Sequence, residues 1–348
     1  MRSGLELVLE ALELAPRTEV VVSAITHPDM VRILERHKLA AVPVDVDPET
    51  LAPVPSALEA AVGDRTGAIL VAHLFGGRVD LTHVAALACE RGLIVLEDCA
   101  QSLRGWDDRG DEAADVSLFS FGSIKTCPAL GGAILYVRRP DLLAKMRALH
   151  ASWPRQPRRE YAARVVRFFG LCALQNPVVY GAFVRVAAAA GIDTDGLVNS
   201  TVHALRPPAG DETEEFQRWL RRQPSVPLLA LLGHRLRRFD AGRLGRRAAL
   251  GEELATSLPA RLPHPGGAAL DRTHWVFPVL AEDPAGLISA LRAAGFDATR
   301  ATTSIAAVGS PPPDRAAELM ERVVFVPAYP ELPRSAVARL KRVLQDAA

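Results

Sequence analysis

The first half of the chain alternates short apolar runs with segments of helical spacing. The apolar runs are typical of buried strands and lie at 19–24, 40–46, 67–74, 93–97, 116–121 and 132–137. Helical patterns occur at 5–14, 29–37, 58–62 and 79–91. This order predicts an α/β domain, a mostly parallel sheet with helices on both faces. Ligands of such sheets bind at the carboxyl ends of the strands.

The pattern changes after residue 150. Residues 151–222 contain Arg- and Pro-rich pieces, an apolar stretch and an acidic helix start, and we interpret them as a helical insertion or bridging region. In residues 223–348 we expect a small C-terminal α+β domain, with an Arg-rich helix at 227–257, strands at 275–280 and 323–326, and helices at 285–294 and 334–345. Residues 1–150 then form the large domain, and 311–313 a turn.

The strongest apolar stretch is Phe168–Val184, and it raises the question of a membrane span. It is shorter than the roughly 20 apolar residues that a span needs, and Pro177 interrupts it. We therefore expect two helices broken at Pro177 and no membrane span. These helices either cover the entrance of a site and select an apolar substrate, or pack into the core.

Composition removes several classes of function. The chain has 348 residues, 49% of them hydrophobic, and a formal net charge of +1, so it can bury a large core and has no general attraction for nucleic acid. Its four cysteines form no CxxC pair, which argues against a disulfide framework or a zinc site. No secretory leader precedes the first helix, so we expect a cytoplasmic protein.

One lysine stands apart from the others. The chain has Lys38, Lys145 and Lys341 in charged helical surroundings, whereas Lys125 follows the apolar run 116–121 and precedes a short Gly-Gly turn. A lysine at a strand end can be desolvated, and the resulting lower pKa makes its amine nucleophilic enough to form an imine. From this context alone, an ordinary loop lysine remains the alternative.

Acids and hydroxyls occur at neighbouring strand ends. The run 93–97 leads into Asp98, and a carboxylate at such a position can keep a heteroaromatic ring nitrogen protonated, although it can also be a helix cap. Ser120 closes the next run, and Ser3 and Gly4 precede the first helical pattern. A hydroxyl and free helix amides are suited to a phosphate.

Together these segments resemble a known family. GLIVLEDCAQSLRG and ADVSLFSFGSIKTCPALGGAILYVR are similar to the EDxAQ and SFxxxK motifs of the pyridoxal-phosphate-dependent aminotransferases of the DegT/DnrJ/EryC1/StrS type. The resemblance covers most of the chain outside 151–222. It implies the fold type I of the aspartate aminotransferase superfamily, with pyridoxal 5′-phosphate as cofactor.

The resemblance also implies roles for individual residues. Lys125 would be the Schiff-base lysine and proton shuttle, and Asp98 would contact the pyridine nitrogen. Gln101 would lie by the phenolic oxygen, and His27 over the ring face. The phosphate would be bound by Ser120 together with Ser3 and Gly4. In the homodimer that the family forms, Arg221 and Arg222 occupy the place from which a partner subunit reaches the phosphate.

The implied activity is transfer of an amino group from an amino donor to a keto substrate, either a sugar or another small metabolite. Two alternatives stay open at this point. The same cofactor also supports lyase or aldolase chemistry, because its electron sink stabilises any carbanion next to the imine. A chain without the family's usual N-terminal segment could instead be a noncatalytic partner subunit, although such a subunit has no need for Lys125.

Overall fold

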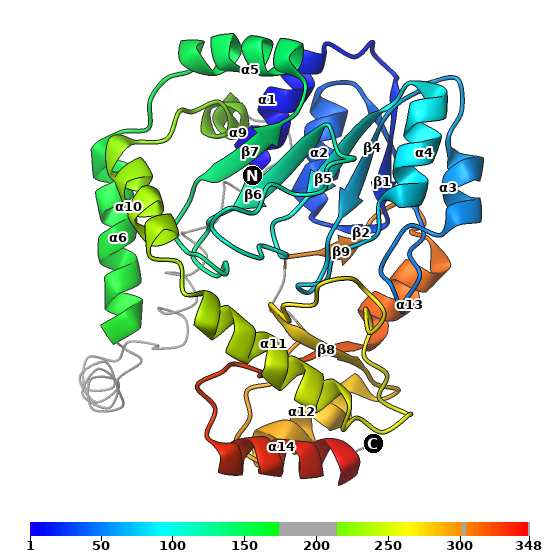
Figure 1. The fold of residues 1–348 in the computed structure, drawn as a ribbon, viewed down its shortest axis with the longest axis vertical. Helices are drawn as coiled ribbons and strands as arrows, with labels where there is room; N and C mark the ends of the chain where they lie inside the picture. The colour runs from blue at the N-terminus through cyan, green and yellow to red at the C-terminus, as the bar shows by residue number, and fades with distance from the viewer. Residues whose placement is uncertain (174–213, 301–303, 347–348) are drawn as a thin grey trace.

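The computed structural model describes residues 1–173, 214–300 and 304–346. A large N-terminal domain is built on a six-stranded sheet, and a smaller C-terminal domain lies beside the lower edge of that sheet in Figure 1. The strand order is β3 (Ala40–Val44), β1 (Glu19–Ser23), β4 (Thr66–Ala72), β5 (Ile94–Asp98), β6 (Val116–Ser120) and β7 (Ala133–Val137). Neighbouring strands are parallel except β7, which is antiparallel to β6.

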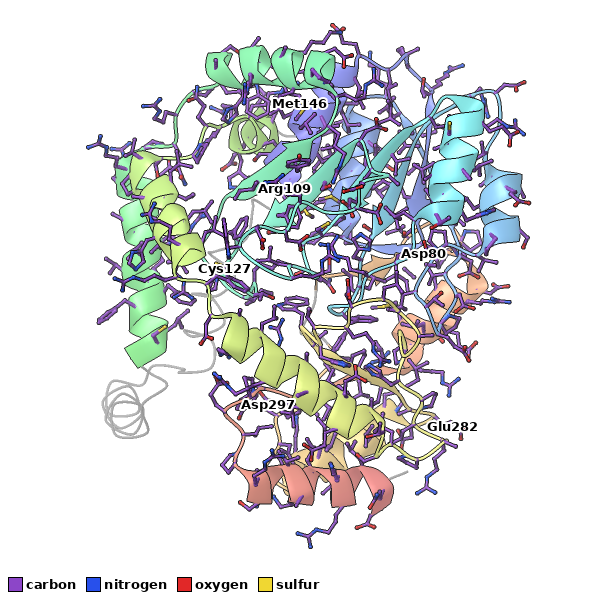
Figure 2. The ribbon with its side chains drawn as sticks, viewed as in Figure 1. Asp80, Arg109, Cys127, Met146, Glu282 and Asp297 are labelled. Atoms are coloured by element: carbon purple, nitrogen blue, oxygen red, sulfur yellow. The ribbon has the colours of Figure 1, made fainter. Side chains whose placement is uncertain are left out.

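Helices bury both faces of this sheet. One face carries α1 (Arg2–Leu12), α2 (Pro28–Arg36) and α5 (Pro140–Ser152), whose Met146 lies in the same core as Leu96 of β5 (Figure 2). The other face carries α3 (Pro55–Ala61) and α4 (Thr82–Arg91), which pack on Val95. Successive side chains of a strand point to opposite faces, so Leu96 and Val95 enter different cores. Burial on both sides explains why these strands read as continuous apolar runs.

Three helices connect the domains among the described residues. They are α6 (Arg158–Ala173), α9 (Glu214–Leu220) and α10 (Val226–Arg237), and α6 and α10 pack around the Gly-Gly turn through Tyr161, Leu228 and Leu130. Phe168 joins this cluster, whereas Phe169 is exposed. The expected break at Pro177 lies outside the described residues. No helix in the described part of the chain is long and apolar enough to cross a membrane.

The prediction of one helix over 227–257 was wrong. The structure has α10 and then α11 (Ala241–Ala255), because Asp240 caps a new helix by accepting a hydrogen bond from the Arg243 amide at 2.7 Å. The helical spacing of apolar and basic residues continues across the break, so the periodicity concealed it, although Asp240 and Gly242 are poor helix formers. The cap itself, an aspartate before a helical segment, was the local signal that could have indicated the second start.

The small domain encloses its own core. β8 (Phe277–Leu280) and β10 (Val323–Val326) pair antiparallel, and α11, α12 (Pro284–Ala293) and α14 (Arg334–Asp346) cover them. An unpredicted helix, α13 (Asp314–Arg322), follows the turn at 311–313. A short pairing of β2 (Ile25–Thr26) with β9 (Ala306–Ala307) joins the two domains beside the large sheet.

Candidate active site

The parallel strands β4, β5 and β6 end side by side, and the residues that follow them form the site. Asp98 ends β5, Ser120 ends β6, and Lys125 lies in the turn after β6. The His73 amide donates to the Asp98 carbonyl at 3.0 Å, and the Cys99 amide to the Leu118 carbonyl at 2.8 Å. These bonds extend the sheet pairing past the strand ends, so the loops that carry the functional groups are held in register.

Lys125 has the properties of a nucleophilic amine. Its backbone amide closes the turn by donating to the Gly122 carbonyl at 3.2 Å, and its side chain is half-buried. The pKa of Lys125 is lowered to about 8. Burial is the largest cause of this decrease and the charge of Arg2 adds to it, whereas the charge of Asp98 acts in the opposite direction. A larger fraction of the amine is therefore unprotonated near neutral pH than in an ordinary surface lysine.

Asp98 is a buried carboxylate without a close cation. Its Oδ1 accepts a hydrogen bond from the Ala100 amide at 2.8 Å, and it makes no ion pair with any described residue. Burial raises the pKa of Asp98, while the Ala100 amide and the more distant charge of Lys125 act in the opposite direction. A carboxylate in this state favours a ligand that brings a positive charge.

Gln101 is oriented by the large domain itself. Its side-chain oxygen accepts a hydrogen bond from the Phe75 amide at 2.8 Å, which leaves the side-chain nitrogen as the group that can donate to a ligand. Ser120 is half-buried at the end of β6. Both therefore lie at the strand ends where the sequence placed them.

The first helix begins earlier than predicted. Ser3 and Gly4 lie inside the first turn of α1, which starts at Arg2, and the Gly4 amide donates to the Met1 carbonyl at 2.7 Å. Gly4 packs so closely on β7 that an added Cβ would lie 2.9 Å from a methyl of Leu135. The Arg2 and Ser3 amides are thus the donors that this turn offers to a phosphate, and Gly4 lets the helix approach the sheet.

His27 caps α2. Its Nδ1 accepts from the Asp29 amide at 3.1 Å, and its Nε2 lies 2.7 Å from a guanidinium nitrogen of Arg2. His27 thus has a capping role within this chain, and stacking of His27 on a cofactor ring stays a prediction. Arg2 itself was not predicted: it also pairs with Asp29, and it is close enough to Lys125 to affect its pKa. No local pattern marks such a residue.

The structure of one chain does not bring Arg221 and Arg222 to Lys125. Arg221 pairs with Glu6 at 2.7 Å and with Glu10 at 3.4 Å on α1, and Arg222 pairs with Glu160 on α6 at 2.8 Å. Either arginine would have to leave these ion pairs to reach the phosphate site of a partner subunit.

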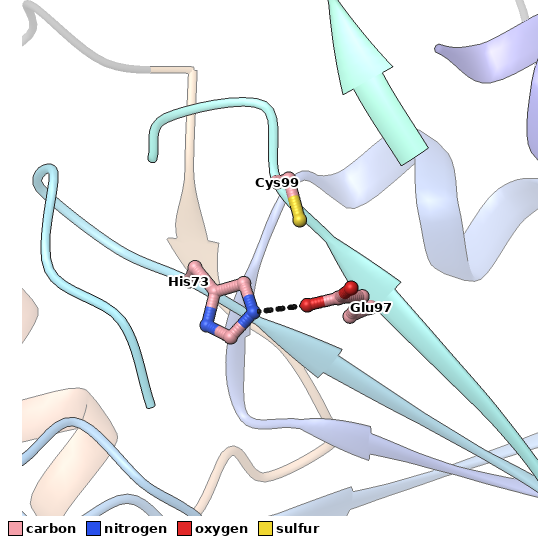
Figure 3. Close-up of side chains that lie close together, drawn as sticks. All are labelled: His73, Glu97 and Cys99. Atoms are coloured by element: carbon pink, nitrogen blue, oxygen red, sulfur yellow. Dashed lines mark hydrogen bonds and ion pairs between the residues drawn. The ribbon is translucent and has the colours of Figure 1, made fainter. Parts of the chain in front are cut away.

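A second polar cluster lies directly beside Asp98. His73, Glu97 and Cys99 bring an imidazole, a carboxylate and a thiol within 4.8 Å of one another (Figure 3). The His73 Nδ1 accepts from the Val79 amide at 3.0 Å, so its Nε2 carries the hydrogen and donates to Glu97 at 2.8 Å. A guanidinium nitrogen of Arg78 lies 3.1 Å from both the Glu97 carboxylate and the Cys99 sulfur. Arg78 thus supplies the positive charge that a metal ion would bring, and we interpret the cluster as structural.

The order of this sheet and the small C-terminal domain are those of fold type I, the fold of the solved aminotransferases that resemble this structure. The TlmJ aminotransferase of Streptoalloteichus hindustanus superposes with a TM-score of 0.68 at 22% identity, over 99% of this chain and 83% of that one. NtdA of Bacillus subtilis, solved with its bound cofactor PMP, has a TM-score of 0.70 at 16% identity, over 99% and 71%. The predicted fold class is confirmed.

Sequence comparison finds similarity to one family. The model of the DegT/DnrJ/EryC1/StrS aminotransferase family matches residues 2–171, just under half of the chain. The UDP-N-acetyl-3-dehydro-alpha-D-glucosamine 3-aminotransferase of Acidithiobacillus ferrooxidans is 36% identical over 156 residues, which are 43% of this chain and 42% of that protein. The match thus spans less than half the length of this curated relative. Enzymes of the family use pyridoxal phosphate.

The residues present fit that cofactor. Asp98, buried without an ion pair among the described residues, matches a protonated pyridine nitrogen, and Lys125 provides the amine for covalent attachment. Gln101 can donate to the phenolic oxygen, and the first turn of α1 with Ser120 offers donors for the phosphate. Each group on this chain thus offers the charge, amine or hydrogen-bond donor that suits the part of the cofactor that it would face.

Proposed function

We propose that this protein is a pyridoxal-phosphate-dependent aminotransferase that moves an amino group from an amino donor to a keto substrate. The observation that carries the proposal is the pair formed by Lys125, an amine with a pKa lowered to about 8, and Asp98, a buried carboxylate without an ion pair among the described residues. Structural carboxylates and lysines normally have partners when buried, so this pair is suited to a ligand.

Two residues perform the chemical work. The cofactor, when bound, supplies an electron sink for the bond that breaks at the substrate carbon. Asp98 holds the proton on the ring nitrogen and so maintains that sink. The Nζ of Lys125 would anchor the cofactor covalently and, when not bound to it, would accept a proton from one carbon and return it to another. A pKa near the operating pH suits both directions of this proton transfer.

For the substrate we propose a keto sugar or a keto group of similar size. The support is the curated relative, whose name describes amino transfer to a UDP-linked dehydro-glucosamine. Lyase or aldolase chemistry is the second candidate, because it needs the same Lys125 and Asp98. Incubation with the amino donor alone distinguishes the two, since an aminotransferase then accumulates the amine form of the cofactor.

The test of cofactor binding begins with the visible absorbance of the purified full-length protein before and after borohydride reduction. We expect a yellow protein and, after reduction and proteolysis, the cofactor on the peptide that contains Lys125. A protein that stays colourless with added pyridoxal phosphate would contradict the proposal and favour a noncatalytic partner subunit.

We also propose a homodimer in which Arg221 and Arg222 act on the partner's phosphate, as the family resemblance suggests. Mixing Arg221→Ala/Arg222→Ala subunits with Lys125→Ala subunits should restore activity in part. If verified mixed dimers have no activity, Arg221 and Arg222 do not act on the partner's phosphate, and their role is limited to the ion pairs with Glu6, Glu10 and Glu160. The cytoplasmic location expected from the sequence remains a prediction, which cell fractionation checks.

The role of the apolar stretch around Pro177 also remains a prediction. Deleting residues 165–190 should either unfold the protein, if the stretch belongs to the core, or leave a folded protein with bound cofactor and a changed substrate range, if it covers the entrance.

A further inference from the structure

A tryptophan of the small domain covers the amine of Lys125. The Nζ of Lys125 lies 4.5 Å from the centre of the Trp275 ring, and the indole N–H donates to the Ile124 carbonyl at 3.0 Å. Trp275 therefore contacts both the side chain of Lys125 and the backbone of the turn that carries it. These residues are 150 positions apart in the sequence.

The loop that carries Trp275 is fixed to the large domain. The Thr273 amide donates to the Gly76 carbonyl at 2.8 Å, and Leu270 and Arg78 exchange backbone hydrogen bonds of 2.8 and 2.7 Å. Gly76 has a φ of +100°, and an added Cβ would lie 2.4 Å from the Trp275 amide nitrogen, so the two loops meet at the closest distance that glycine allows.

A buried arginine reinforces this connection. Arg247 of α11 donates to the Thr273 carbonyl at 2.8 Å and lies 3.3 Å from the hydroxyl of Thr126, the residue after Lys125. Its side chain thus bridges the loop that carries Trp275 and the turn that carries Lys125. The position of the ring over the amine is therefore determined by both domains.

We propose that Trp275 is a positioning residue for Lys125: its ring face holds the ammonium form of the amine in place and stabilises its charge. An aromatic face attracts a cation through the ring quadrupole, most strongly where water is excluded. Burial disfavours the protonated form of Lys125, and the contact with the ring favours it. Trp275 therefore helps Lys125 to hold the proton that the proposed reaction requires it to transfer. The contact is independent of the cofactor, whereas its use in catalysis rests on the proposed function.

The experiment measures the pKa of Lys125 in the full-length protein freed of cofactor. Competitive labelling with isotope-coded acetic anhydride from about pH 6 to about pH 11, read by mass spectrometry, reports each lysine separately. Lys38, Lys145 and Lys341 lie on other peptides and serve as internal references. The measurement needs no cofactor, so failure to bind pyridoxal phosphate would affect the proposed function and leave this result unchanged.

We expect Trp275→Leu to lower the pKa of Lys125 by about half a unit to one unit, because leucine keeps an apolar cover but has no ring face. Trp275→Phe should lower it less, since phenylalanine keeps a weaker ring face, and this variant also serves if Trp275→Leu does not fold. Trp106→Leu, at a tryptophan that is 67% exposed, is the matched control and should leave Lys125 unchanged. In a catalytically active preparation, the pH profile of kcat should move in the same order.

An unchanged or raised pKa of Lys125 in folded Trp275→Leu would overturn the proposal. The same conclusion follows if Trp275→Leu does not fold and Trp275→Phe has the pKa of the wild type. The labelling of the three reference lysines must be the same in every variant, so a general change in reactivity cannot imitate the expected order.

Discussion

Glu97 and Asp98 are adjacent carboxylates at the end of one strand, and they have opposite surroundings. Glu97 is fully buried and accepts hydrogen bonds from His73 at 2.8 Å, from Arg78 at 3.1 Å and from the Asp111 amide at 2.6 Å. Burial alone would raise the pKa of Glu97, but the hydrogen bond and charge of His73, a hydrogen bond with Ser117 and the charge of Arg78 lower it to about 2. For Asp98 the effect of burial prevails, and its pKa is raised.

The difference separates an acid whose partners lie within the protein from the acid that we propose for the cofactor. Because side chains alternate across a strand, Glu97 faces the loop that holds Arg78, whereas Asp98 faces the side of α1 and Lys125. Arg78 also pairs with Asp108 at 2.7 Å and contacts the Ser102 carbonyl, so the Glu97 network holds the loop after β5. Glu97 thus has several partners within the protein, whereas Asp98 accepts one hydrogen bond, from the Ala100 amide, and has no ion pair among the described residues.

The largest effect is expected at the residue that Asp98 faces. Lys125→Ala should abolish covalent attachment of the cofactor and lower turnover by at least about 10²–10⁴-fold, the range for a general acid-base group. Cofactor held by Asp98, Gln101 and Ser120 should still bind, but more weakly. Borohydride fixation and steady-state kinetics measure both effects. The control is Lys145→Ala, which removes a surface partner of Glu13. If Lys125→Ala still bound the cofactor covalently, another lysine would be the residue that attaches it.

The same substitution at the two neighbouring acids should then separate stability from function. Glu97→Gln should lower the free energy of unfolding by about 3 kcal/mol, the low end of the range for breaking a buried ion pair, because Arg78 keeps Asp108. Asp98→Asn should leave the cofactor-free protein as stable as the wild type or more so, since it removes a buried charge without a close partner. Denaturant unfolding measures both variants.

For the affinity of the cofactor we expect the opposite order. Asp98→Asn should bind the cofactor more weakly, whereas Glu97→Gln should keep the affinity of the wild type at temperatures where the variant is folded. If both variants lost the same property to the same extent, the distinction between the two carboxylates would be wrong.

Two glycines allow the Glu97 network to be disturbed without removing a charge. Gly110 has a φ of +82°, and an added Cβ would lie 1.8 Å from a Glu97 oxygen, whereas Gly92 has a φ of +64° and nothing within 4 Å. Both Gly→Ala variants incur the strain of a left-handed backbone, about 1–2 kcal/mol. Gly110→Ala should lose about 1–3 kcal/mol more than Gly92→Ala, because it also displaces Glu97. Equal losses would mean that the network tolerates displacement of its carboxylate.

The smallest effect is a difference in pH dependence. The folded pKa of Glu97 lies below its ordinary value of 4.5, so its contribution to stability is present above pH 4.5 and is lost as the pH falls toward about 2. The folded pKa of Asp98 lies above its ordinary value of 3.8, so its contribution is present below pH 3.8 and is lost as the pH rises through the folded pKa.

In the cofactor-free protein, the stability of Glu97→Gln relative to the wild type should therefore fall as the pH rises from acid, whereas the relative stability of Asp98→Asn should rise. Thermal unfolding across this range measures both differences. If the two differences changed with pH in the same direction, the assignment would be wrong.

Local pattern was enough for the six strands of the large sheet and for α1 to α4, whereas α5 was not predicted. The run at 93–97 became β5 at Ile94–Asp98, and the run at 116–121 became β6 at Val116–Ser120, because strands buried on both faces need continuous apolar residues. Asp98 directly follows the first run and Lys125 lies four residues after the second, and the family resemblance singled out both as candidates. The break between α10 and α11 was missed because the helical spacing continues across it. The helix α13 was missed because it follows a Pro-rich segment.

The sequence by itself thus determined the sheet, the strand ends and the candidate lysine and aspartate, all of which depend on residues a few positions apart. Tertiary structure alone decided that Arg78 neutralises Glu97, that Arg2 lies near Lys125 and that Trp275 covers its amine. These contacts join segments 19 to 150 residues apart, and no local periodicity records them. They form because packing and hydrogen bonding bring distant loops to the same edge of one sheet, where charge and burial act through space.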